Sequence, residues 1–414
     1  MRSSSMRLVI LGVLLSVFFI IFLSSCSTNN INLSNNNFAK LDAANFTPIP
    51  NCNAIGSRFD CYAQFFQDSV KSLGPENALK LIEGLDKNDS FVHEQCHQLV
   101  HVLGRASFDY YNDAIKAYSH GTPFCWSGYY HGILEQYLKR SPEIKAAVKD
   151  ICRSDEIRQT GYLHYQCVHG LGHGLMYYFD NEIFPSLEHC DLLEDNWSKT
   201  SCYGGVFMEN IIADELGNKD HTAKYLKTDD TIYPCNAVDY SYKERCYIMV
   251  TSHILKVNGY NFEDAFTKCA NVEPSYGNLF KEICFVSIGR DASGSTKSDP
   301  DRTLAKCAMA KVLSLNATTA NLTSIAEEYC IIGAAKDFVS NFAGAKEASV
   351  MCKKLSGKDK EGTEKSKLER LRKKCIIAMA NILSTLFSDQ DKKLAECKAL
   401  VPDDYDDCVK GLDY

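Results

Sequence analysis

The sequence predicts an all-α fold, a solenoid of α-α hairpins in which a disulfide staples each hairpin. From Cys152 onward the cysteines fall into close pairs, and a helix end precedes the first member of a pair, as in AAVKDIC, DAFTKC and RTLAKC. An apolar helical run follows the second member, as in CYGGVFMENII and CIIAMANIL. The first members recur at steps of 34 to 45 residues, which is the period of helical-hairpin repeats.

The N-terminal 25 residues have the three parts of a signal peptide. Arg2 and Arg7 give a positive start, an apolar run extends over residues 8–22, and small residues stand directly before Cys26. This arrangement resembles a bacterial-type lipoprotein signal, the lipobox. The resemblance implies that residues 1–25 are removed and that Cys26 carries a lipid. An ordinary signal peptide or an uncleaved anchor is the alternative, and each version places the folded part outside the cytoplasm.

Residues 26–50 predict a flexible tether. The segment is rich in Asn and Ser, has no sustained apolar period and ends with two prolines, a composition that buries too little apolar surface to fold. The expected location is therefore the cell envelope, lipid-anchored outside the cytoplasmic membrane, in the periplasm or on the cell surface. The expected membrane contact is the lipid anchor.

Residues 51–414 predict one disulfide-stapled helical-repeat domain. Setting Cys26 aside leaves an even number of the 19 cysteines, and none forms a CxxC pair. In an oxidising compartment this favours disulfides over zinc ribbons or thioredoxin-like redox motifs. The expected pairs are Cys52-Cys61, Cys96-Cys125, Cys152-Cys167, Cys190-Cys202, Cys235-Cys246, Cys269-Cys284, Cys307-Cys330, Cys352-Cys375 and Cys397-Cys408. The architecture is of the TPR/HEAT kind, although no TPR signature residues are present.

The composition limits the partners of this domain. The formal net charge is −7, and loss of Arg2 and Arg7 would make it more negative. We expect no nucleic-acid partner, because neutralising phosphates requires a basic face. The sequence also lacks the G-x-S-x-G elbow and the phosphate-binding glycine loops that would indicate a serine hydrolase or a nucleotide site.

The second helix of each hairpin shows a common register. A small residue stands three positions after the second cysteine, as at Gly128, Gly170 and Gly205, which predicts close approach of a neighbouring helix. One turn later the same face carries polar residues, including His131, His173 and the pair Met208-Glu209. These polar groups are expected to line one continuous face.

Histidine is concentrated in the N-terminal half. Eight of the 11 histidines lie between His93 and His173. The segment HEQCHQLVHVLGR places histidines at i, i+4 and i+8, which predicts one stripe on a helix, and HYQCVHGLGHGL adds a second group. Two imidazoles at i and i+4 can bind one metal ion from a single helix. The candidate ligands are His93, His97, His101, His131, His164, His169, His173, Met208, Glu135 and Glu209.

These patterns favour a protein that binds a transition metal, with Zn, Cu or Fe undetermined. Imidazole with carboxylate suits zinc or iron, and imidazole with thioether suits copper. A competing interpretation is that the histidines only form hydrogen bonds within helix packing.

Two other functions remain open at this point. One is a non-catalytic interaction scaffold whose lined face receives a protein or glycan partner, with Trp126, Tyr129, Tyr130, Tyr177 and Tyr178 as contacts. The other is a zinc hydrolase, because HEQCH matches H-E-x-x-H and Glu94 would then be the general base. The longer metzincin pattern fails, since Val100 and Leu103 stand where it requires Gly and His. We therefore expect a binding protein more than an enzyme.

Overall fold

The computed structural model describes residues 52, 57–215 and 224–413, which are helical with no strand among them. The predicted signal peptide (1–25), the lipidation site Cys26 and the tether (26–50) lie outside the described residues. No described helix combines the length and the apolar character needed to cross a membrane.

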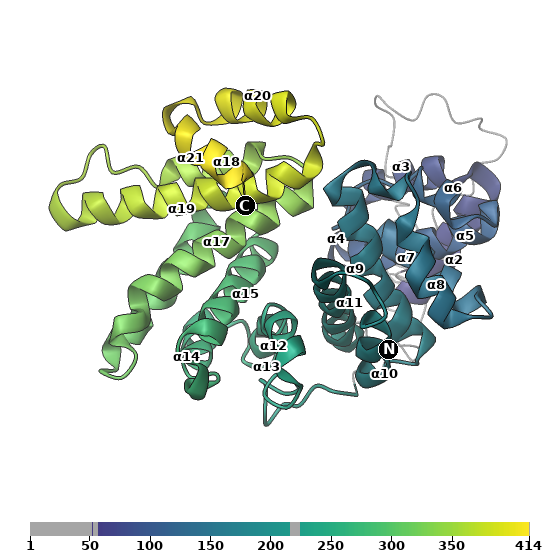
Figure 1. The fold of residues 1–414 in the computed structure, drawn as a ribbon, viewed down its shortest axis with the longest axis horizontal. Coiled ribbons are helices and arrows are strands. Elements are labelled where there is room, and N and C mark those ends of the chain that lie inside the picture. Colours follow the sequence, from purple (N-terminus) through teal and green to yellow (C-terminus); the bar gives the residue numbers. More distant parts are fainter. Residues whose placement is uncertain (1–51, 53–56, 216–223, 414) are drawn as a thin grey trace, which may run out of the picture. The chain divides into compact units, whose positions relative to one another are not determined.

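The described helices before residue 216 include five of at least 13 residues, α2, α5, α7, α9 and α11, with shorter ones between them (Figure 1). Their bounds are α2 (Arg58–Leu73), α3 (Pro75–Asp86), α4 (Ser90–Glu94), α5 (Cys96–Tyr111), α6 (Ala114–Tyr118), α7 (Gly128–Arg140), α8 (Ile144–Asp150), α9 (Gly161–Tyr178), α10 (Ile183–Cys190) and α11 (Asn196–Glu215).

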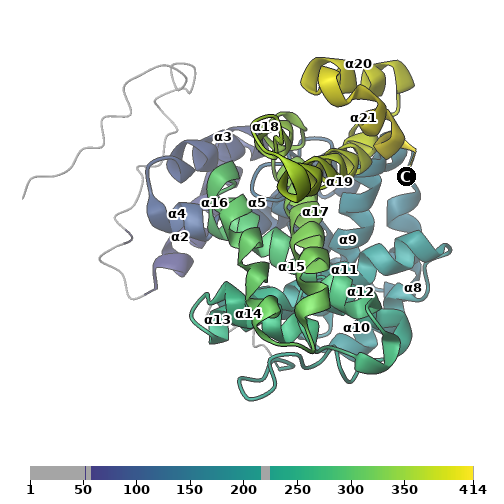
Figure 2. The same ribbon diagram turned by 90° about the vertical axis from the view of Figure 1, so that its left-hand side faces the viewer.

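The described helices after residue 223 include three long ones, α15, α17 and α19, and shorter ones before, between and after them (Figure 2). Their bounds are α12 (Tyr240–Tyr247), α13 (Thr251–Val257), α14 (Phe262–Ala270), α15 (Leu279–Ser295), α16 (Pro300–Cys307), α17 (Thr323–Phe342), α18 (Lys346–Lys354), α19 (Gly362–Leu386), α20 (Gln390–Leu400) and α21 (Tyr405–Leu412).

Local sequence explains where many of these helices begin. Side chains that accept a hydrogen bond from the first helical turn stand before α4 (Asp89), α9 (Thr160) and α16 (Asp299). Such a cap satisfies backbone N–H groups that have no partner inside the helix and contributes about 1 kcal/mol. Proline at the first position of α3 and α16 fits because its missing N–H would have no helical partner.

Nine disulfides link the cysteines of the described residues, and they are the pairs expected from the spacing of the cysteines. They join Cys52 to Cys61, Cys96 to Cys125, Cys152 to Cys167, Cys190 to Cys202, Cys235 to Cys246, Cys269 to Cys284, Cys307 to Cys330, Cys352 to Cys375 and Cys397 to Cys408. Several tie the last residue of a short helix to a position within the first half of the following long one, as from α10 to α11 and from α16 to α17. This chemistry fits an oxidising compartment outside the cytoplasm.

The long helices α5, α7, α9 and α11 pack side by side in that order, and so do α15, α17 and α19, with the short α21 against α19 (Figures 1 and 2). Glycines allow the close approach. A Cβ atom on Gly132 would lie 2.0 Å from the carbonyl oxygen of His101, and one on Gly205 would lie 1.9 Å from that of His169. The same contact recurs between Gly333 and Val286. The small residues expected three positions after the cysteines therefore face a neighbouring backbone, as at Gly205 and Gly333.

One contact goes beyond neighbouring hairpins. Helix α9 touches α19, with Gly161 against Thr385. In a linear solenoid each repeat contacts only its neighbours, so this contact does not belong to that architecture. The all-α class and the stapled hairpins are what the structure shows, and the TPR/HEAT-like solenoid stays a prediction.

Candidate metal centre

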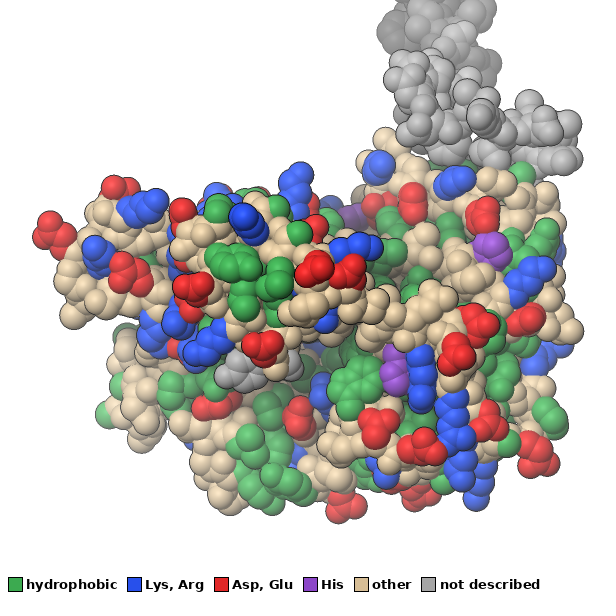
Figure 3. Space-filling model, turned by 45° about the horizontal axis from the view of Figure 1, so that its top comes forward, with side chains coloured by type: hydrophobic (Ala, Val, Ile, Leu, Met, Phe, Trp, Pro, Cys, Tyr) green, Lys and Arg blue, Asp and Glu red, His purple; other side chains and the backbone are tan. Residues whose placement is uncertain are grey.

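Five histidines from three adjacent helices meet in one cluster. His97 and His101 come from α5, His131 from α7, and His169 and His173 from α9. All are buried except His97, which is half-buried. Histidine accordingly appears only in small patches on the face drawn in Figure 3. We call these five residues the histidine cluster.

The distances between the rings define the cluster. The ring centroids of His97 and His101 are 4.6 Å apart, and those of His169 and His173 are 5.1 Å apart. His131 lies between the two pairs, stacked on His173 at 4.4 Å with an interplanar angle of 11°. The spacing of i and i+4 puts each pair on one helix face, and the packing glycines bring those faces together.

In the first pair, His97 and His101, each Nδ1 atom is hydrogen-bonded to an oxygen. His97 Nδ1 donates to the carbonyl oxygen of Cys125 at 2.8 Å, and His101 Nδ1 lies 2.5 Å from Oε1 of Glu135. A carbonyl can only accept a hydrogen bond, and so can an ionised carboxylate, so Nδ1 carries the proton in both rings. Their Nε2 atoms, 3.1 Å apart, then face each other with lone pairs.

The second pair repeats this arrangement. His169 Nδ1 lies 3.3 Å from the carbonyl oxygen of Ser201, and His173 Nδ1 lies 2.7 Å from Oε2 of Glu209. Their Nε2 atoms are 3.3 Å apart, and Sδ of Met208 lies 3.3 Å from Nε2 of His169. A thioether is an acceptor and a soft metal ligand, so it adds a third electron pair directed at the same place.

His131 offers a further nitrogen. Its Nε2 lies 3.2 Å from the amide oxygen of Gln166, and its Nδ1 is buried without a hydrogen-bond partner. Ligand atoms of His131, His97 and His101 lie within 4.8 Å of one another, and so do those of His131, His169 and His173. His131 is therefore within reach of both pairs.

The electrostatics disfavour the charged form of three of these imidazoles, those of His97, His131 and His169. Burial, reinforced by the neighbouring His101, lowers the pKa of His97 to about 3. Burial and the nearby His173 lower the pKa values of His131 and His169 well below the usual range. Neutral imidazole is the form that binds metal ions, since the lone pair must be free.

Glu135 is held as a carboxylate. Burial alone would raise its pKa, but His101 and Arg105 outweigh burial and lower it. Arg105 forms an ion pair with the second oxygen of Glu135. An ionised carboxylate on the far nitrogen of an imidazole fixes the tautomer and strengthens the ring as a ligand.

The Nε2 separations match those of two ligands on one ion. Zinc–nitrogen bonds are about 2.0–2.1 Å, and in a tetrahedral site two such nitrogens lie about 3.3–3.4 Å apart. The observed separations are 3.1 Å for the first pair and 3.3 Å for the second. The cluster can thus accommodate a transition metal with small adjustments.

His93 lies outside the histidine cluster. Helix α4 ends at Glu94 and α5 begins at Cys96, while Gln95 between them has ψ 11°. The predicted single stripe of His93, His97 and His101 is therefore wrong at His93, because the helix is interrupted. His93 instead contacts Asp86 at 3.0 Å, and Glu94 is exposed. The H-E-x-x-H match thus does not lie on one continuous helix.

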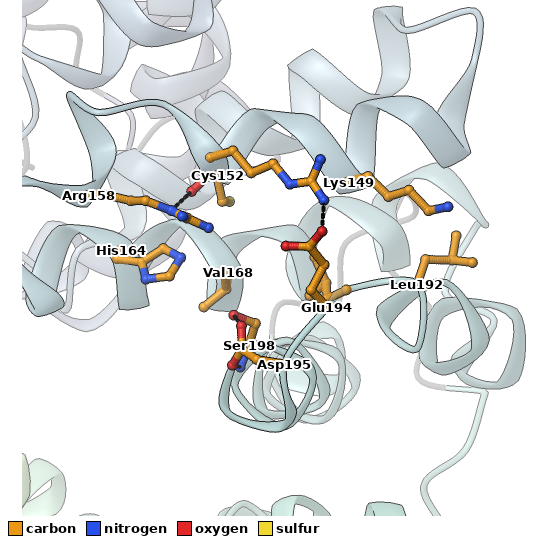
Figure 4. A pocket seen from close by; sticks show the side chains of 11 residues that line it. Lys149, Cys152, Arg158, His164, Val168, Leu192, Glu194, Asp195 and Ser198 are labelled. Atoms are coloured by element: carbon orange, nitrogen blue, oxygen red, sulfur yellow. Dashed lines mark hydrogen bonds and ion pairs between the residues drawn. The ribbon is translucent and has the colours of Figure 1, made fainter.

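His164 also lies apart from the cluster. It borders a small cavity with Arg158, Val168 and Asp195 (Figure 4), and its ring is 5.1 Å from that of Trp197. Burial and the nearby Arg158 lower its pKa.

The sequence reasoning missed Arg105 as a member of the site. The sequence does contain a signal for it, because Arg105 stands four residues after His101 and so lies on the same face of α5. Gln166, which contacts His131, was not among the predicted site residues either.

No protein-family model, no curated protein and no solved structure matches this chain. The function is therefore argued from the site alone.

Proposed function

We propose that this protein binds a transition metal through the histidine cluster, with Met208 as an additional ligand and Glu135 and Glu209 as the groups that orient His101 and His173. The observation that carries the proposal is the pair of facing Nε2 atoms on α5, 3.1 Å apart, repeated on α9 at 3.3 Å.

Two unprotonated nitrogens at this separation repel each other unless a positive species lies between them. A shared proton is one such species, and burial, which lowers the pKa of His97 and of His169, disfavours that proton on those two rings. A metal ion removes the repulsion and uses both lone pairs. The same four Nδ1 partners that fix the tautomers then act as outer support for the ligands.

The ligand types favour zinc, copper or iron. Imidazole alone suits all three, whereas the thioether of Met208 beside His169 favours copper, and Cu(I) in particular. The carboxylates of Glu135 and Glu209 point at the Nδ1 atoms of histidines, which leaves them in a supporting role.

The hydrolase and scaffold interpretations have less support. Glu94 is exposed and His93 is outside the cluster, so the residues of HEQCH do not form a zinc site. Tyr129 and Tyr130, two of the aromatic residues considered for a partner, are buried.

We further propose that the metal is bound outside the cytoplasm by a protein anchored through a lipid on Cys26. The nine disulfides support the compartment, and the signal-like N-terminus supports the anchor. Expression of the full chain with and without Cys26→Ser tests the anchor. The wild type should be found in the membrane fraction and be released by detergent, and the variant should not be found in that fraction. Equal partitioning of both would contradict lipidation at this position.

Metal content tests the main proposal. Protein purified without chelator, and chelator-treated protein reloaded with Zn(II), Fe(II) or anaerobic Cu(I), should hold at least one ion per chain by elemental analysis. The variant His101→Gln should bind at least tenfold more weakly. The control His93→Gln should bind like the wild type, because it changes a histidine outside the cluster. A wild-type protein that takes up none of these ions at micromolar concentration would disprove metal binding.

A further inference from the structure

We infer that the histidine cluster holds two metal ions, one on each pair of histidines. This inference rests on the proposed metal-binding function. The first centre would use His97 and His101 of α5. The second would use His169 and His173 of α9 with Met208 of α11. His131 lies between them and can complete either sphere.

The number of donors exceeds what one ion needs. A tetrahedral ion takes four ligands, while the cluster offers five imidazoles and a thioether. The facing nitrogens are also grouped in pairs. The Nε2 atoms are 3.1 Å apart in the first pair and 3.3 Å apart in the second.

Two sets of three imidazoles each have ligand atoms within 4.8 Å of one another, and His131 is the histidine that the sets share. A further group, made of His101, Glu135, His173 and Glu209, connects the two pairs through the supporting carboxylates. Nδ1 of His131 is buried and has no hydrogen-bond partner. A buried nitrogen lone pair without a partner costs free energy, and a metal ion in either set would satisfy it.

Each pair has its own supporting groups. In the first, a backbone carbonyl holds His97 and Glu135 holds His101. In the second, a backbone carbonyl holds His169 and Glu209 holds His173. Each pair consists of one imidazole supported by a carbonyl and one supported by a carboxylate, and such support is a feature of a complete ligand set.

The two proposed centres differ in the chemistry of their ligands. The first contains nitrogen donors alone, whereas Met208 Sδ lies 3.3 Å from Nε2 of His169 in the second. Thioether ligands select Cu(I), while imidazole sets accept zinc as well. Each centre also includes one half-buried ligand, His97 in the first and Met208 in the second, so each has its own contact with solvent.

Stoichiometry tests the inference. Metal-free full-length protein is titrated with Zn(II), and separately with Cu(I) under anaerobic conditions, and bound metal is measured after removal of free ions. The wild type should hold two ions. The double variants His97→Gln/His101→Gln and His169→Gln/His173→Gln should each hold one.

The outcomes are distinguishable. One ion per wild-type chain, lost in both double variants, would overturn the two-centre inference but leave the proposed function in place. No bound ion in the wild type would overturn both. Circular dichroism checks that the variants are folded.

A spectroscopic measurement on the wild type does not depend on the double variants. X-ray absorption of the Cu(I) form should show a sulfur ligand at about 2.3 Å, the usual metal–sulfur distance, on half of the copper. Met208→Leu should remove it and lower affinity for the second Cu(I) about tenfold, with Zn(II) stoichiometry unchanged. Sulfur ligation on all of the copper would contradict two unlike centres.

Discussion

Replacing Glu135 by Gln removes the negative charge of the side chain but keeps its size, so the contribution of the charge can be measured by itself. The carboxylate of Glu135 contacts His101 at 2.5 Å through one oxygen and pairs with Arg105 through the other. Glutamine keeps the size of the side chain and one acceptor oxygen. It removes the negative charge that both neighbours use.

The expected loss has two parts. An outer-shell partner of a metal-bound histidine typically contributes 10- to 100-fold to affinity, which is about 1.4–2.7 kcal/mol. The metal-free protein should also lose stability, because Arg105 is only 18% exposed and its partner is 1% exposed. Breaking a buried pair by removing one partner costs about 3–5 kcal/mol, and the exposed fraction of Arg105 argues for about 3.

Two assays measure these parts separately. Competition with a chelator of known affinity gives the metal dissociation constant, and urea unfolding in excess chelator gives the stability of the metal-free form. The pH dependence has a definite sign. Because the pKa of Glu135 is lowered in the fold, the stabilisation is complete above the unfolded pKa of 4.5 and is lost as the pH falls through the folded value. The difference between wild type and variant should therefore shrink in acid.

Glu94→Gln is the matched control. It makes the same chemical change at an exposed carboxylate outside the cluster, so affinity should not change and stability should change by less than about 0.5 kcal/mol. Unchanged metal affinity in Glu135→Gln, or a loss in Glu94→Gln comparable to it, would refute the assignment of Glu135 as a support for His101.

Three other predictions concern the fold. Gly132→Ala should lower the stability of the protein by about 1–3 kcal/mol in thermal melts, because the new Cβ would lie 2.0 Å from the carbonyl oxygen of His101. Gly294→Ala is the control: no atom lies within 4 Å of the new Cβ, so this variant should be more stable than the wild type by up to about 1 kcal/mol. Replacing Cys307 and Cys330 together by Ser should cost about 3 kcal/mol in urea unfolding, because their link closes a loop with a sequence separation of 23; no loss would contradict this. Burial raises the pKa of Asp337 from 3.8 to about 6, so above pH 6 the fold has to bury an ionised carboxylate. Asp337→Asn removes this charge and should stabilise the protein at pH 7.5 by up to about 3 kcal/mol. The two proteins should be equally stable near pH 4, and a gain that persists there would point to another cause.

The disulfide pairing could be predicted because each bridge is local. The two cysteines of a pair are between 9 and 29 residues apart, and the helix pattern around them repeats along the chain. The break at Gln95 could not be predicted, because the sequence around it keeps helical spacing. The contact between α9 and α19 joins distant segments and has no local signal.

The cluster was predictable in part for the same reason. The i, i+4 spacing of His97 and His101 and the shared register of His131 and His173 are local properties, and the structure brings these residues together. His93 and His164, each three positions before a cysteine, looked equivalent to them. One lies on the far side of the helix break and the other on a separate cavity. Spacing gives the face of a helix, but only packing decides which faces meet.

The second half of the chain shows that this packing does not require histidine. Gly333 meets the carbonyl of Val286 as Gly205 meets that of His169, so the two helix pairs can be aligned on these contacts. Four residues after Val286 stands Arg290, where the first half has His173. Four residues after Gly333 stands Asp337, where it has Glu209.

The same glycine contact therefore forms with arginine and aspartate in place of histidine and glutamate. If helix packing alone explained the imidazoles, the equivalent positions in the second half should need them too. The concentration of imidazoles on α5, α7 and α9 therefore supports the proposed ligand, and the facing Nε2 atoms on α5 and α9 favour a cation as that ligand.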